Sequence, residues 1–124
     1  MDPRILPGTF LLVMGAALAC FVKAYRVRLD RRRHVRWAAT GAAIDVAGTI
    51  TVLVVSKGLA IHVPVRDAGA ASVHRVLAYA ATVLLATQVA TGIARVRVHP
   101  TLGRVFLAVY AAAYVLAAVA YAPW

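Results

Sequence analysis

The stretch ILPGTFLLVMGAALACFV, residues 5–22, decides the fold because it runs for eighteen residues without a charged side chain. A helix of about 18 to 20 apolar residues is long enough to cross a bilayer. Pro7 lies near the start of this run, where its missing N–H breaks no helical hydrogen bond. We therefore predict a transmembrane helix over residues 5–22.

The rest of the 124-residue chain has the same apolar character. Its apolar share is 63%, against roughly 45–50% in soluble domains, and its mean hydropathy is +0.81. Further apolar runs cover residues 37–56, 73–94 and 102–121. Backbone polar groups must be satisfied within hydrocarbon, and the alternating pattern of a membrane barrel is absent, so helices are expected. The sequence predicts a single domain over residues 1–124, an all-α, integral membrane four-helix bundle.

The basic residues indicate how the bundle is oriented. Seven of the fourteen lysines and arginines lie in residues 23–36, which we interpret as a basic cytoplasmic loop in contact with anionic lipid. With the N-terminus and C-terminus outside (periplasmic or extracellular), ten basic residues lie inside and four outside. This bias predicts a multi-pass membrane protein whose basic loop is cytoplasmic. We expect no nucleic-acid partner, because the charge of +10 is not spread over a water-exposed face.

The four histidines are the most informative residues for function. The topology places His34 and His99 at the cytoplasmic face, and His62 and His74 at the outer face. Imidazole is a common ligand for haem iron and for copper. Each pair could hold a b-type haem, or His62, His74 and Asp67 could form a copper site on the outer surface.

A second interpretation of the histidines stays open at this point. All four are expected at helix ends, where histidine also serves as an interfacial polar residue, and they lack the short spacings of a specific metal motif. A single cysteine, Cys20, excludes an internal disulfide or a Cys-pair metal site. No nucleophile paired with a base, phosphate-binding glycine loop or pair of carboxylates is recognisable, so we expect a protein without catalytic activity.

Asp45 is the one charged residue near the middle of a predicted span. A carboxylate at that depth is costly, by roughly 2.5–3.5 kcal/mol on insertion scales, so it should face the bundle interior and find a partner. We expect a buried hydrogen bond from Gln88 or from a tyrosine hydroxyl such as Tyr110. The pair would serve either as a polar clasp between helices or in a proton relay or ligand site.

From the basic segment almost to the C-terminus, the order of residues resembles a family of small bacterial membrane proteins. This family consists of four-helix, histidine-bearing proteins of unknown function associated with cytochrome oxidase maturation. The resemblance uses His34-Val35-Arg36-Trp37, His62, His74 with Leu77-Ala78, and Arg95-Val96-Arg97-Val98-His99 with Gly103-Arg104. It implies a non-catalytic accessory protein of haem-copper respiratory oxidase assembly or function that holds copper or haem through its histidine pairs. It also implies a place in a bacterial inner (plasma) membrane.

Two alternative functions follow from the residues themselves. Histidine pairs at both membrane faces suit a b-type haem protein that transfers electrons across the bilayer. Alanine-rich helix faces suit a structural subunit that packs against a larger membrane complex, because small residues let membrane helices approach closely.

Overall fold

The computed structural model describes residues 5–59 and 63–122, and these residues form four long helices. They are α1 (Ile5–Arg26), α2 (Arg31–Leu53), α3 (Ala68–Ile93) and α4 (His99–Tyr121), with a short π-helix, η1 (Val54–Gly58), continuing α2. Each long helix is long and apolar enough to span a membrane. The predicted all-α fold with four candidate spans is confirmed, and the described residues contain no strand.

The helices extend beyond the predicted spans at the basic end. Residues 23–36, predicted as a loop, are helical except for residues 27–30. Apolar length marks the part of a helix that lies in hydrocarbon, whereas arginine is a good helix former and carries a helix on into the headgroup region. Asp30 fixes the start of α2, because its carboxylate accepts a hydrogen bond from the Arg33 N–H at 3.1 Å.

The helix α3 also begins earlier than the predicted span, at Ala68 instead of residue 73. The side chain of Asp67 caps it and accepts a hydrogen bond from the Ala70 N–H at 2.9 Å. His74 therefore lies in the second turn of α3 instead of opening it. A capping residue supplies an acceptor for an otherwise unpaired N–H, which explains why the helix starts directly after Asp67.

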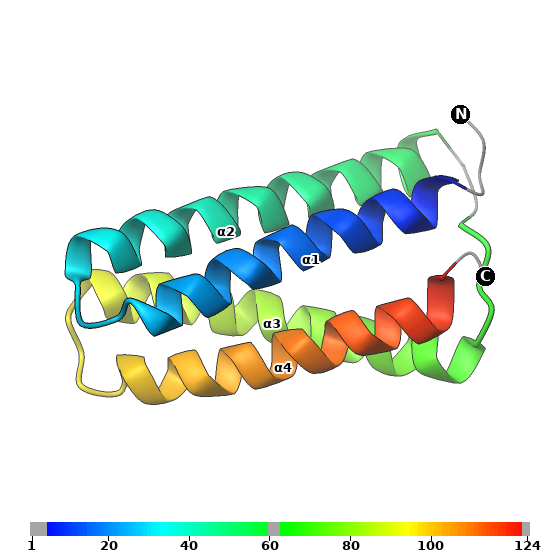
Figure 1. Ribbon diagram of the computed structural model, residues 1–124. Coiled ribbons are helices and arrows are strands. Elements are labelled where there is room, and N and C mark those ends of the chain that lie inside the picture. Colours follow the sequence, from blue (N-terminus) through cyan, green and yellow to red (C-terminus); the bar gives the residue numbers. More distant parts are fainter. Residues whose placement is uncertain (1–4, 60–62, 123–124) are drawn as a thin grey trace.

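The four helices pair as two antiparallel hairpins, α1 with α2 and α3 with α4 (Figure 1). The hairpins meet mainly where α1 packs on α4, and among the described residues α2 and α3 have no extensive contact. The connections 27–30 and 94–98 lie together at one end of the bundle, which we call the basic end (Figure 1). The start of α1, the end of α4 and the α2–α3 connection lie at the opposite end (Figure 1).

The core lies along the α1–α4 seam. Phe21 of α1 stacks edge-on against Phe106 of α4, with ring centroids 4.8 Å apart, and its ring lies 5.3 Å from that of Tyr110. Gly41 of α2 makes room for Phe21, because a Cβ atom there would lie 2.8 Å from the phenylalanine ring. The same glycine therefore allows α2 to pack closely against α1.

Candidate functional site

His34 and His99 come together at the basic end. His34 lies in the first turn of α2, and His99 is the first residue of α4. Their ring centroids are 5.9 Å apart and the ring planes are nearly perpendicular, at 86°. The structure therefore brings together the two histidines that the topology placed at one face, and their contact links the two hairpins.

The hydrogen-bond network assigns the tautomer of both rings. The Nδ1 atom of His34 lies 3.0 Å from the carbonyl oxygen of Ala24, which can only accept, so this Nδ1 carries the proton. The Nδ1 atom of His99 lies 3.2 Å from the hydroxyl oxygen of Thr91. That hydroxyl donates to the Thr87 carbonyl at 2.8 Å and thus accepts from His99. In the neutral form of each ring, Nε2 then keeps its lone pair.

The C-terminal part of α3 completes this group of polar residues. The side-chain amide of Gln88 donates to the His99 carbonyl at 3.1 Å. Gly92 lies beside the His99 ring, where a Cβ atom would come within 3.0 Å of Cε1. We define the histidine cluster as His34, Gln88, Thr91 and His99. Thr91 and Gly92 were not predicted; the only signal in the sequence is that they follow Gln88 by one helical turn.

Basic residues flank His34 in the sequence. His34 directly follows the three arginines 31–33 and precedes Arg36 by two residues. His34 and His99 also lie in the first turns of their helices, where the helix dipole adds a partial positive charge. A divalent cation is therefore disfavoured at this place, whereas a monovalent ion or a ligand with anionic groups is tolerated better.

The middle of the bundle contains the predicted hydrogen bond of the Asp45 carboxylate. The hydroxyl of Tyr110 on α4 donates to Asp45 Oδ1 on α2 at 2.6 Å. Of the two expected partners, Tyr110 makes this bond, whereas Gln88 bonds the backbone of His99 in the histidine cluster. Asp45 is half-buried and faces the interior as expected. The bond ties α2 to α4 near the middle of both helices.

The predicted outer site is only partly described. His74 on α3 donates from Nδ1 to the Ala113 carbonyl of α4, 2.8 Å away, and its ring centroid lies 5.8 Å from that of Tyr121. Its expected partner His62 lies outside the described residues. Asp67 acts as the cap of α3. Within residues 5–59 and 63–122, no three His, Cys, Asp or Glu side chains gather as a metal site.

The comparison with known proteins leaves the histidine cluster as the main basis for function. No protein-family model, curated protein or solved structure matches the chain. The fold and the site together define a bundle of four membrane-spanning-capable helices with a histidine pair from two helices at its basic end.

Proposed function

We propose that this chain is a non-catalytic accessory protein of haem-copper respiratory oxidase assembly or function, and that His34 and His99 hold copper in its monovalent state. The observation that carries the proposal is the ring contact at 5.9 Å between two imidazoles whose Nδ1 atoms are both held by oxygen acceptors. The link to an oxidase is supported by the resemblance of the chain from residue 34 onward to the oxidase-associated family.

The donor set fits copper(I). Imidazole nitrogen suits copper, and a metal-ligating histidine characteristically donates its other ring N–H to an oxygen. Copper(I) accepts as few as two nitrogen ligands, which is what His34 and His99 offer. Its single charge is also the smallest that a transition-metal ion brings into the positive surroundings of the histidine cluster.

A b-type haem fits this pair less well. Rings with centroids 5.9 Å apart in a perpendicular arrangement are in direct contact. A macrocycle could enter between them only if the α1–α2 hairpin moved away from the α3–α4 hairpin. A single ion needs much less movement.

We further propose that the histidine cluster faces the cytoplasm of a bacterial inner membrane, with both termini outside. Ten of the fourteen lysines and arginines then lie on the cytoplasmic side, in keeping with the positive-inside rule. In a Cys20→Ala background, a cysteine introduced at exposed Leu29 should resist an impermeant maleimide in intact cells, and one at Val65 should react. The reverse labelling pattern would invert the proposed topology.

Anaerobic titration of the purified, detergent-solubilised chain with copper(I) against a chromogenic chelator tests the copper site. We expect one equivalent bound, and loss of binding in His34→Ala and in His99→Ala. His74→Ala is the matched control, because His74 has the same Nδ1 anchoring but lies on α3 away from this pair, so its binding should match wild type. Equal binding by all four proteins, or none by wild type, would refute the assignment.

Two further experiments test whether the pair binds haem instead of copper and whether the protein serves an oxidase. A haem band in the reduced-minus-oxidised spectrum of protein from native membranes, if lost in His34→Ala, would show that the pair binds b-type haem and not copper. In a host strain without this protein, we expect oxidase activity and oxidase copper content to fall, with rescue by wild type but not by His34→Ala. Full oxidase activity in that strain would refute the oxidase role and leave the copper site to be judged by the titration alone.

A further inference from the structure

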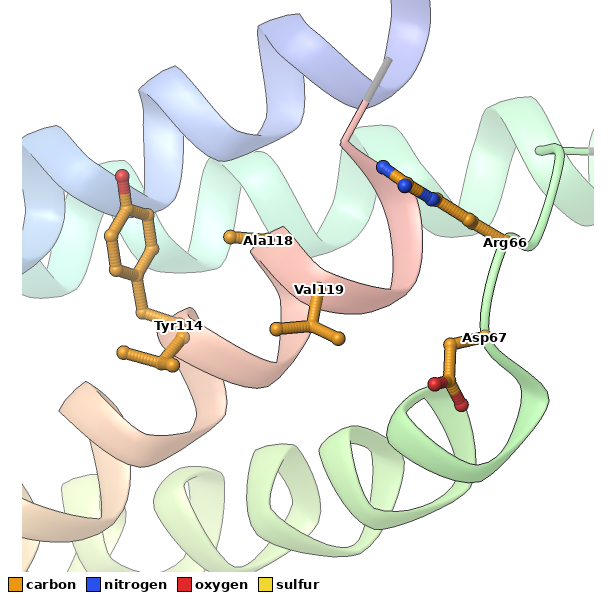
Figure 2. Close-up of a pocket in the computed structure, with 6 residues that line it drawn as sticks. Arg66, Asp67, Tyr114, Ala118 and Val119 are labelled. Carbon is orange, nitrogen blue, oxygen red and sulfur yellow. The ribbon is translucent and has the colours of Figure 1, made fainter. Parts of the chain in front are cut away.

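A cavity of about 510 Å³ lies at the end of the bundle opposite the histidine cluster. It is formed between the segment before α3 and the last turns of α4 (Figure 2). Its lining consists of Arg66, Asp67, Tyr114, Val115, Ala118 and Val119. The volume is within the range of small-molecule sites, about 300–1,000 Å³.

Two opposite charges are fixed at the mouth of this cavity. The Arg66 backbone N–H donates to the Ala120 carbonyl at 2.8 Å, which ties the segment to the end of α4. Asp67 is held one residue later, because its Oδ1 caps α3. Figure 2 shows the Arg66 side chain reaching over the end of α4 while the Asp67 carboxylate lies toward the start of α3. The cavity mouth thus presents a guanidinium and a carboxylate in separate directions.

The wall below this mouth is apolar and open to lipid. Val115 and Val119 are 58% and 49% exposed. At a rise of about 1.5 Å per residue, Tyr114 lies roughly 10 Å deeper along α4 than Tyr121 at the helix end. The cavity therefore combines a charged entrance at the membrane surface with an apolar wall that runs into the membrane. This combination matches an amphipathic molecule.

We propose that this cavity binds a phospholipid whose headgroup carries a primary ammonium group, of the phosphatidylethanolamine type. Arg66 would bind the phosphate, because a guanidinium has five N–H donors and can serve the phosphate beside another partner. Asp67 would accept from the ammonium through Oδ2, which makes no hydrogen bond with any described residue. One acyl chain would lie along Val115 and Val119.

The charge pattern selects this headgroup against the two common alternatives. A phosphatidylcholine headgroup has the same charges, but its quaternary ammonium has no N–H to donate to Asp67. A phosphatidylglycerol headgroup lacks the cation and places its negative charge near the Asp67 carboxylate. This site is separate from the histidine cluster, so the inference does not depend on the proposed function.

Lipid retention tests this inference with the full chain. The protein is reconstituted in vesicles of equal parts phosphatidylethanolamine, phosphatidylcholine and phosphatidylglycerol, extracted in mild detergent, and its bound lipids are weighed by native mass spectrometry. We expect wild type to retain the ethanolamine lipid over the choline lipid by about fivefold, the upper range for an exposed ion pair.

Asp67→Asn should bring this ratio to about one, while Asn still caps α3 well. Asp30→Asn is the matched control, because Asp30 caps α2 in the same way at the basic end, and it should leave the ratio unchanged. Val119→Trp should reduce retention of all three lipids, because the larger side chain would occupy the space of the acyl chain. Equal retention of the three lipids by wild type, a preference for phosphatidylglycerol, or an unchanged ratio in Asp67→Asn would each overturn the proposal.

Discussion

The α1–α4 seam and the outward faces of α2 and α3 contain similar residues in opposite surroundings. Tyr110 in the seam is 3% exposed, and Tyr79 on α3 is 74% exposed. Phe21 is 5% exposed, whereas Val76 is 67% exposed. Apolar character therefore does not separate buried from exposed positions in this chain, because lipid tails and a protein core are equally apolar.

Alanines line the seam together with its aromatic rings. Ala17 of α1 and Ala113, Ala117 and Ala120 of α4 are at most 3% exposed. They let the two backbones approach, and the aromatic rings fill the space between them. The outward faces of α2 and α3 have no such partner among the described residues, and they present valines, isoleucines and threonines to the surroundings.

The largest effect should come from emptying the seam. Phe106→Ala removes a ring that is 4% exposed and stacked on Phe21, so we expect the free energy of unfolding to fall by about 3 kcal/mol. Val83→Ala, at a position that is 66% exposed on α3, should change it by less than about 0.5 kcal/mol. Unfolding of each variant in mixed micelles with increasing dodecyl sulfate measures both. Similar losses would show that the seam is not the packed core.

Overfilling the α1–α2 contact should have a somewhat smaller effect. In Gly41→Leu the new side chain meets the Phe21 ring, because even a Cβ atom would lie 2.8 Å from it. We expect a loss of about 2 kcal/mol in the same assay. Ala43→Leu, two residues on and exposed, adds similar bulk toward lipid and should be tolerated. If both variants are equally stable, α2 does not pack on α1 as described.

The hydrogen bond between Asp45 and Tyr110 sharpens the comparison for polar groups. Tyr110→Phe keeps the ring but removes the 2.6 Å hydrogen bond to Asp45. A double-mutant cycle with Asp45→Leu, which removes the acceptor, should give a coupling energy of about 1 kcal/mol, since interhelical bonds in membranes average near 0.6 and reach about 1.7 kcal/mol. Tyr79→Phe, at the exposed position, should show no coupling to Asp45. If Tyr110 and Asp45 also show no coupling energy, the bond does not hold α2 to α4.

The four helices and the shared helical face of His34 and Asp45 could be predicted from the sequence, because both depend on local patterns. The four helices follow from apolar length, and the eleven-residue spacing of His34 and Asp45 placed both on one helical face. In the structure both side chains indeed meet residues of α4, His99 and Tyr110. The choice of Tyr110 over Gln88 depends on how α2 and α3 sit against α4, which no local pattern in the sequence encodes.

The helix ends and the contacts within the histidine cluster could not be predicted from the sequence, for different reasons. The predicted spans stopped at the charged residues, but the caps at Asp30 and Asp67 set the true starts of α2 and α3. The role of Thr91 in holding His99 requires the register between α3 and α4. This register depends on how two separate helices align, so it cannot be read from the sequence of either helix alone.

The smallest expected effect tests that register directly. Gln88 lies fourteen residues after His74, and Ala113 lies fourteen residues after His99, so the two side-chain-to-backbone bonds between α3 and α4 share one antiparallel alignment. Gln88→Leu removes one of them at nearly constant volume. We expect a loss of about 0.6 kcal/mol, the typical worth of an interhelical hydrogen bond in a membrane.

A matched change at the other position separates alignment from local packing. His74→Leu breaks the second bond, to the Ala113 carbonyl. If the two bonds support one shared alignment, each single change already weakens the other bond, so the double variant should lose less than the two single variants added together. Copper(I) titration of Gln88→Leu gives an independent measurement: weaker binding is expected, because the freed His99 backbone loosens a ring that Thr91 alone then positions. Strict additivity together with unchanged copper binding would mean that each bond acts locally, and that the ends of the α3–α4 hairpin are positioned by apolar packing alone.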